Sequence, residues 1–96
     1  MPAAACLASR VPFGEKITAQ RLRRIGAAEA ILRAIAGSKA LLRARDHGTI
    51  LRIEASRDDL SKFIGRPVKD FSGLKKLGYK YITLDMEGYI PAGLRG

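Results

Sequence analysis

The sequence predicts a small α+β domain with the element order α-β-β-α-β, in which an antiparallel three-stranded sheet packs against two helical segments. Apolar residues recur at helical spacing over 18–36, two β-compatible runs flank a turn at 46–48, and a second helical region precedes an alternating run over 79–86. The 96 residues leave room for one core. We therefore divide the chain into a loop over 1–16 and a single α+β domain over 17–96.

Helix boundaries follow from the residues that can satisfy free backbone groups. Thr18 can cap the first helix, and Gly37 can end it. Ser56 precedes two acidic residues and can cap the next helical region. Pro67 lacks a backbone donor and disfavours helix in the residue before it, so this region divides into helices over about 57–64 and 68–77.

The predicted hairpin has one strongly basic face. Strand side chains alternate, so a loop with an even number of residues gathers one set on a single face, namely Arg43, Arg45, Arg52 and Glu54. In that register we expect Arg45 opposite Ile50 and Arg43 opposite Arg52. Three guanidinium groups repel one another unless an anion or Glu54 lies among them, and guanidinium binds phosphate bidentately. We interpret the face as an anion site, and a solvated basic surface is the alternative.

Composition limits the classes of protein to which the chain can belong. A formal charge of +9 favours phosphate-bearing partners, which include nucleotides, nucleic acid and anionic surfaces. The single cysteine excludes an intrachain disulfide, a four-cysteine zinc site and a self-contained iron–sulfur cluster, and it suits a reducing compartment. The N-terminus lacks the pattern of a signal peptide, and no apolar run approaches about 20 residues. We expect a cytoplasmic protein that has no membrane partner.

Two side chains stand out because of their surroundings. Cys6 lies four residues before Arg10 in a cationic chain, where positive charge favours the thiolate, although a lone cysteine can also be an inert small hydrophobe. Glu29 lies within the apolar stripe of the first helix. It either lies at the edge of the stripe, where it reaches water or pairs with Arg33 one turn away, or binds a divalent metal or a cationic group at a subunit interface.

Four blocks of the sequence resemble the C-terminal domain of the LarE family. They are Cys6–Arg10 with the Val-Pro-Phe-Gly that follows, Leu42–Arg45 with His47, Arg52–Glu54, and Leu77–Tyr89. LarE proteins are ATP-dependent sulfur transferases of the PP-loop superfamily, and members build the nickel-pincer nucleotide cofactor of lactate racemase. The resemblance spans nearly the whole chain, whereas the closing Ile90–Arg95 differs from the ending of many members.

The resemblance implies a chemistry for the N-terminal block. In the family, an N-terminal domain with an SGGxDS-type loop, a pattern this chain lacks, uses ATP to adenylate a substrate carboxylate. Cys6 matches the cysteine that attacks the adenylate and gives up its sulfur, leaving dehydroalanine. Other members use three cysteines and an iron–sulfur cluster, which one cysteine cannot supply. Ser9 and Arg10 match the pair that follows the cysteine, and Glu54 resembles a further active-site acid.

The resemblance also implies binding roles and partners. Arg43 and Arg45 look like phosphate-binding arginines, and we add Arg52 to them from the hairpin pattern, whereas Glu29 looks like a metal-binding glutamate. Residues 1–16 then form the reactive-cysteine loop, and 17–96 bind a nucleotide-like, phosphate-bearing substrate. The expected partners are an N-terminal PP-loop domain or partner chain, which would bind ATP, and further copies of the chain in a trimer or hexamer. Without that domain we expect no activity.

A basic nucleic-acid-binding module without catalytic activity is the alternative function. In that case the positive charge and three tyrosines would recognise bases and phosphates. Tyr79 and Tyr81 are expected on one face of the last strand, where they would serve base stacking, the core or an interface. A nucleic-acid binder would not need Cys6, whereas a sulfur donor would.

Overall fold

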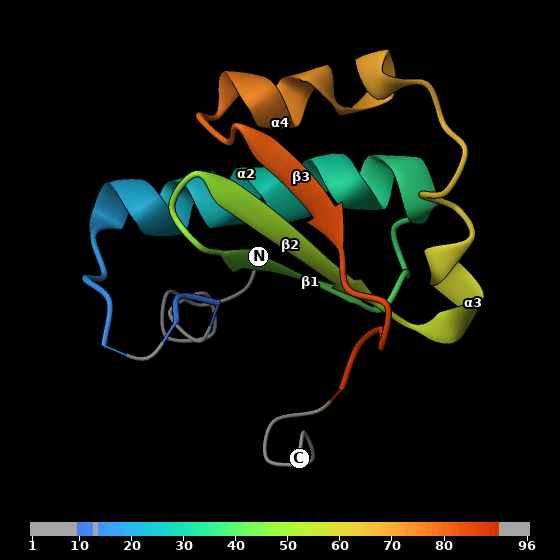
Figure 1. Ribbon diagram of the computed structural model, residues 1–96, viewed down its shortest axis with the longest axis horizontal. Coiled ribbons are helices and arrows are strands. Elements are labelled where there is room, and N and C mark those ends of the chain that lie inside the picture. Colours follow the sequence, from blue (N-terminus) through green and yellow to red (C-terminus); the bar gives the residue numbers. More distant parts are fainter. Residues whose placement is uncertain (1–9, 13, 91–96) are drawn as a thin grey trace.

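The computed structural model describes residues 10–12 and 14–90, so Cys6 and Ser9 of the first motif lie outside the described residues. The described elements follow the order expected from the sequence (Figure 1). They are α2 (Ala19–Ala36), β1 (Leu42–Asp46), β2 (Ile50–Ala55), α3 (Arg57–Leu60), the 3₁₀-helix η1 (Val68–Phe71), α4 (Ser72–Lys76) and β3 (Tyr81–Leu84).

The α+β class is confirmed, and the sheet is mixed. The strands lie in the order β1-β2-β3; β1 and β2 are antiparallel, whereas β3 runs parallel to β2. The expectation of an entirely antiparallel sheet was therefore wrong for the third strand. The chain between β2 and β3 passes through α3, η1 and α4, and a crossover of this kind returns the chain to the end of the sheet at which β2 begins.

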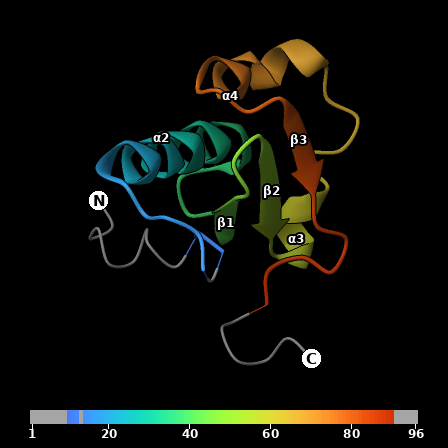
Figure 2. The ribbon, with the colours of Figure 1, turned by 60° about the vertical axis from the view of Figure 1, so that its left-hand side comes forward.

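The first helix has the predicted boundaries. The Thr18 hydroxyl accepts a hydrogen bond from the backbone N–H of Arg21 at 3.0 Å, which is the contact expected of an N-cap. Gly37 follows the helix with φ +115°, a conformation that favours glycine. Figure 2 shows α2 lying across one face of the sheet, where its apolar stripe meets the strands.

The hairpin has the predicted parity but not the predicted register. Arg43 lies opposite Glu54 and Arg45 opposite Arg52, a shift of two residues from the expected pairing. The strand continues through Asp46 and the backbone N–H of His47 donates to the Ile50 carbonyl, so the loop contains only Gly48 and Thr49, and Gly48 has a positive φ, which favours glycine. Because a shift of two residues preserves strand parity, the side chains still lie on the predicted faces.

The second helical region is shorter than predicted. α3 ends at Leu60, and turns continue to residue 65, where a helix over 57–64 was expected. Ser56 occupies the N-cap position without capping a backbone N–H; its hydroxyl donates instead to the carboxylate of Asp59 at 2.8 Å. η1 and α4 together cover 68–76, close to the predicted helix, and begin directly after Pro67.

The last strand is also shorter than the predicted run over 79–86. Gly78 has φ +109°, which turns the chain just before Tyr79. Tyr79 is 1% exposed and precedes β3, whereas Tyr81 is in β3 and is 60% exposed. The two tyrosines therefore do not share one face of a strand, because the backbone between them does not have the regular alternation of a strand.

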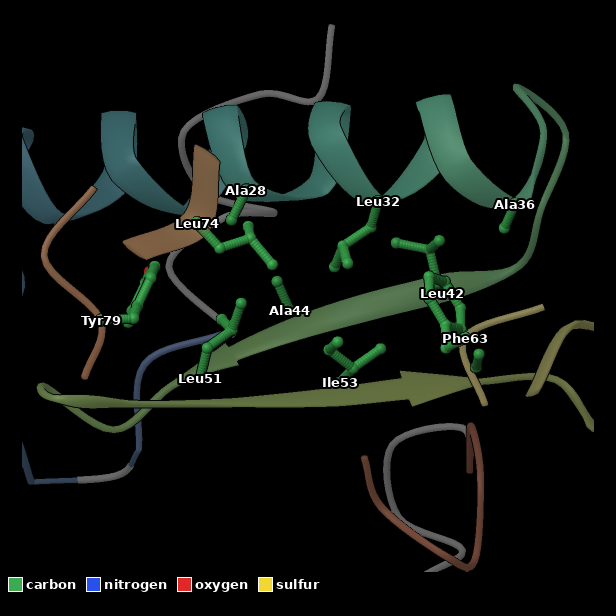
Figure 3. Close-up of a cluster of buried hydrophobic side chains, with 11 residues drawn as sticks. Ala28, Leu32, Ala36, Leu42, Ala44, Leu51, Ile53, Phe63, Leu74 and Tyr79 are labelled. Atoms are coloured by element: carbon green, nitrogen blue, oxygen red, sulfur yellow. The ribbon is translucent and has the colours of Figure 1, made fainter. Parts of the chain in front are cut away.

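One apolar core joins α2, the hairpin and α4 (Figure 3). Phe63 and Tyr79 belong to this core. Its aliphatic members come from all of these elements and are Ala28, Leu32, Ala36, Leu42, Ala44, Leu51, Ile53, Ala55 and Leu74. No helix in the part of the chain that the structure describes has both the length and the apolar character needed to cross a membrane.

Candidate functional site

The basic face of the hairpin, formed by Arg43, Arg45, Arg52 and Glu54, lies opposite the core face of the strands. Glu54 is only 2% exposed and is held between two of the arginines. Its Oε1 lies 3.1 Å from Arg45 Nε, and its Oε2 lies 2.6 Å from Arg52 Nη1. From the sequence we expected either an anion or Glu54 to lie among the guanidinium groups, and in the structure Glu54 lies between two of them.

Arg52 connects this face to the segment that follows β3 and to the hairpin turn. Its Nη1 also lies 2.6 Å from Asp85 Oδ2, and its Nε donates to His47 Nε2 at 3.2 Å. Burial lowers the pKa of His47, and the nearby charge of Arg52 lowers it further. The neutral imidazole accepts the arginine's hydrogen bond, so His47 acts here as a turn residue that orients Arg52.

Arg43 differs from the other two arginines. Its Nη1 donates to the carbonyl of Leu42 at 2.9 Å, and its guanidinium lies over the Tyr89 ring, 4.9 Å from the ring centroid. Among the described residues no carboxylate pairs with Arg43. Tyr89 is held in place by its backbone N–H, which donates to the Ala55 carbonyl at 2.8 Å. The excess positive charge of the basic face therefore resides on Arg43.

A second cluster forms along the edge of β1. Glu29 projects from α2, is 1% exposed, and accepts two hydrogen bonds at Oε2. The donors are Arg10 Nε at 3.0 Å and the backbone N–H of Ala44 at 2.9 Å. The Arg10 carbonyl also accepts the backbone N–H of Asp46 at 2.9 Å. Glu29 and Arg10 thereby satisfy the donors of an otherwise open strand edge and fix the position of Arg10.

The structure modifies both interpretations of Glu29. Arg33 is near, as the spacing predicts, but its Nη1 lies 3.6 Å from Glu29 Oε1 and the carboxylate does not reach solvent. No hydrogen-bond donor among the described residues serves Oε1. No group of three His, Cys, Asp or Glu side chains that could hold a metal gathers within the described ranges. Metal binding by Glu29 stays a prediction that requires ligands from elsewhere.

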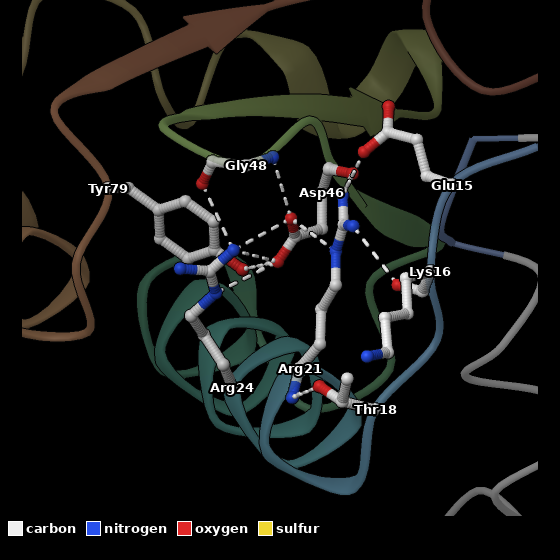
Figure 4. Close-up of polar contacts among 8 residues, drawn as sticks. All are labelled: Glu15, Lys16, Thr18, Arg21, Arg24, Asp46, Gly48 and Tyr79. Atoms are coloured by element: carbon white, nitrogen blue, oxygen red, sulfur yellow. Dashed lines mark hydrogen bonds and ion pairs between the residues drawn. The ribbon is translucent and has the colours of Figure 1, made fainter.

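The sequence analysis missed a buried network around Asp46 (Figure 4). The side chain of Asp46 is fully buried and accepts from Arg21 Nε at 3.0 Å, from two nitrogens of Arg24 at 2.8 and 2.9 Å, and from the Gly48 N–H at 2.9 Å. The Tyr79 hydroxyl donates to Asp46 at 2.6 Å. Asp46 therefore joins α2, the hairpin turn and the segment before β3.

Asp46 could have been singled out from the sequence by its position. Asp46 falls in register with Leu42 and Ala44 on the aliphatic face of its strand, which is a costly place for an unpaired carboxylate. Burial raises the pKa of Asp46, but hydrogen bonds from Tyr79, Gly48 and Arg24 outweigh it and hold the pKa below its ordinary value. Asp85 lies in the last block of the family resemblance, where its role was not anticipated.

Comparison with known proteins finds no matching family model. The chain is 38% identical over 93 residues to an uncharacterized protein of Synechocystis sp. and 32% identical over 88 residues to one of Methanocaldococcus jannaschii. It is 31% identical over 87 residues to the pyridinium-3,5-bisthiocarboxylic acid mononucleotide synthase of Lactiplantibacillus plantarum. Each alignment covers 91–92% of this chain and 31–34% of the relative. The chain is thus related to a portion of that synthase and spans about a third of the length of these relatives.

Proposed function

We propose that the chain is the sulfur-donor and substrate-binding part of an ATP-dependent sulfur transferase that acts on a carboxylated pyridinium mononucleotide. The name of the similar synthase describes a product with two thiocarboxylic acid groups on a mononucleotide. The observation that carries the proposal is the basic face of the hairpin, where three arginines meet two carboxylates. The excess positive charge suits the single phosphate of a mononucleotide.

Phosphate would enter beside Arg43. This arginine has no carboxylate partner among the described residues, and the ring of Tyr89 supports its guanidinium. Arg45 and Arg52 are held in fixed positions by Glu54, so their guanidinium groups are preorganised. We assign phosphate binding to these three arginines and acid–base work near the reacting carboxyl group to Glu54.

The proposed reaction needs no redox partner. The thiolate of Cys6 attacks the carbonyl carbon of the acyl adenylate, a C–S bond forms, and AMP leaves. A base then takes the Cα proton of Cys6; the electron pair forms the Cα=Cβ double bond, and the Cβ–S bond breaks. The sulfur departs on the substrate as a thiocarboxylate, and dehydroalanine remains at position 6. Ser9 and Arg10 would orient the acyl group in this scheme.

The Glu29 carboxylate supports the position of Arg10 in this proposal. The ion pair between Arg10 Nε and Glu29 is buried on both sides, with side-chain exposures of 7% and 2%. Arg10 follows Cys6 by four residues, so this pair anchors the chain close to the proposed nucleophile. A divalent metal at Glu29 would require carboxylates from further copies of the chain in a trimer or hexamer.

Supplying the activated substrate tests the sulfur-transfer step without an ATP-binding domain. The chain is incubated with a chemically prepared acyl adenylate of a pyridinium dicarboxylic acid mononucleotide, and the peptide that contains Cys6 is followed by mass spectrometry. We expect a thioester adduct and then loss of the elements of H₂S from residue 6. Cys6→Ser should show no such loss. Free glutathione is the control thiol, which shows whether the adenylate is reactive. If glutathione consumes the adenylate while Cys6 keeps its sulfur, the proposal fails.

Binding of a mononucleotide tests the basic face separately. Nicotinic acid mononucleotide should raise the melting temperature of the chain, because a ligand at tenfold its Kd stabilises by about 1.4 kcal/mol. Arg43→Gln should reduce this shift, whereas Arg57→Gln removes an exposed charge elsewhere and should leave it unchanged. An equal reduction in both variants would indicate only non-specific attraction to a cationic protein.

A further inference from the structure

A second cationic hollow lies between α2 and α4, beside the tip of the hairpin. Its volume is about 640 Å³, and none of the three arginines of the basic face lines it. Its walls come from three separate parts of the chain: the first half of α2, the end of α4, and the turn at Gly48. The residues to which the proposed sulfur transfer assigns roles do not line this hollow.

The α2 wall is a single helical face. Gln20, Arg23, Arg24 and Ala27 line the hollow, and residues spaced by three, four and seven positions lie on the same side of an α-helix. This face belongs to the N-terminal part of an 18-residue helix, where the helix dipole adds partial positive charge. Lys76 lies on the opposite wall at the last residue of α4.

Positive charge in the hollow exceeds the carboxylates that contact it. Four cationic side chains line it, and Glu15 and Asp46 are the acids that pair with Arg21 and Arg24. The other two cations, Arg23 and Lys76, have no ion-pair or hydrogen-bond partner among the described residues. About half of the positive charge is therefore left for a ligand.

Arg24 is held rigidly at the side of this hollow. Its Nε and Nη2 bind Asp46, Nη2 also donates to the Gly48 carbonyl at 3.0 Å, and its guanidinium stacks 4.3 Å from the centroid of the Tyr79 ring. Nη1 lies on the side of the guanidinium away from Asp46 (Figure 4). Among the described atoms Nη1 has no hydrogen-bond partner. A fixed guanidinium with an unused donor costs little entropy when an anion binds.

We propose that this hollow binds a compact polyanion that carries two adjacent phosphates. Cations that face one hollow from separate elements suit a small, densely charged ligand, whereas an extended nucleic acid is expected to need a longer track of positive charge. Two unpaired cations and the Arg24 donor match a diphosphate better than a single phosphate. This site is distinct from the basic face of the hairpin, and its occupation does not depend on Cys6.

Calorimetric titration with inorganic pyrophosphate tests the site. We expect pyrophosphate to bind more tightly than inorganic phosphate. The double variant Arg23→Gln/Lys76→Gln should weaken pyrophosphate binding at least about tenfold, the factor equivalent to about 1.4 kcal/mol. Both residues are exposed, so the fold should persist, and the circular dichroism melting curve checks this. The matched control Arg57→Gln/Lys69→Gln removes the same charge from exposed positions outside the hollow and should change the affinity less than twofold.

Three outcomes would overturn the proposal. The first is pyrophosphate binding that is no tighter than phosphate binding. The second is a control variant that loses as much affinity as the hollow variant, which would indicate general attraction to a basic protein. A single-stranded RNA that binds tightly and that pyrophosphate does not displace would indicate a nucleic-acid surface instead. Arg43→Gln separates this site from the proposed function, because it should weaken mononucleotide binding and leave pyrophosphate binding intact.

Discussion

The substitution Tyr79→Phe tests whether the buried Asp46 network holds the fold together. It removes one hydroxyl and leaves the ring in place over Arg24. The lost hydrogen bond joins the Tyr79 hydroxyl to a fully buried carboxylate at 2.6 Å. Asp46 keeps its bonds to Arg21, Arg24 and Gly48, so the change isolates a single contact of the network.

The expected cost follows from the charge of the acceptor. A hydrogen bond to a charged group contributes about 1.5–3 kcal/mol, and the remaining partners of Asp46 place this loss at the lower end, about 1.5–2 kcal/mol. In a domain of this size each kcal/mol lowers the melting temperature by about 4–8 °C, so we expect a decrease of about 6–16 °C. Urea unfolding at neutral pH measures the free energy directly.

The alkaline pH dependence provides a second readout. Burial raises the pKa of Tyr79, and the hydrogen bond to Asp46 raises it further. The pKa of Tyr79 is thus higher in the folded than in the unfolded state. The protonated hydroxyl therefore contributes stability that is fully present below the unfolded pKa of about 10 and is lost as pH rises through the folded pKa. The stability difference between wild type and Tyr79→Phe should therefore narrow above about pH 10.

Tyr81→Phe is the matched control. Tyr81 is 60% exposed, and loss of its hydroxyl should change the free energy of unfolding by less than about 0.5 kcal/mol. Equal costs for the two substitutions, or a difference that stays constant to high pH, would refute the role given to the Asp46 network.

Three further predictions concern other parts of the fold. Glu29→Gln should destabilise the chain by about 1.5–3 kcal/mol, because Arg10 and the Ala44 N–H both donate to Glu29 Oε2. The control Arg33→Gln should cost less than about 1 kcal/mol, and equal costs in urea unfolding would contradict the role of Glu29 at the edge of β1. Gly88→Ala should cost more than Gly65→Ala, since both have φ +79° but only at Gly88 would a Cβ meet a backbone oxygen, at 2.7 Å from Ala55; similar melting temperatures would exclude this clash. The ionised carboxylate of Asp46 should contribute stability that is present above about pH 4 and is lost as pH falls through its lowered folded pKa. An Asp46→Asn variant that still folds but unfolds in acid like wild type would contradict this contribution.

Local sequence signals were sufficient where the deciding interactions lie within a few residues. The first helix could be predicted from Thr18 and Gly37, since capping and positive φ depend on neighbours along the chain. The basic face could be predicted because strand alternation places Arg43 and Arg45 on one side, and any loop with an even number of residues brings Arg52 and Glu54 to that side. The apolar stripe also identified Glu29 as a carboxylate in need of a partner.

The identity of long-range partners was decided only by the tertiary structure. Arg10 reaches Glu29 across 19 positions, Tyr79 reaches Asp46 across 33, and Arg52 reaches Asp85 across 33. No local pattern specifies which buried carboxylate meets which donor, because that choice depends on how the helix and strands pack.

The sequence by itself determined the α+β class, the first helix, the basic face and the presence of a single cysteine. The tertiary structure decided the parallel placement of β3, the two-residue shift of the hairpin, and the burial of Asp46. The physical reason is that helix capping and strand alternation act between near neighbours, whereas register and strand direction depend on which distant groups satisfy buried charges and strand edges.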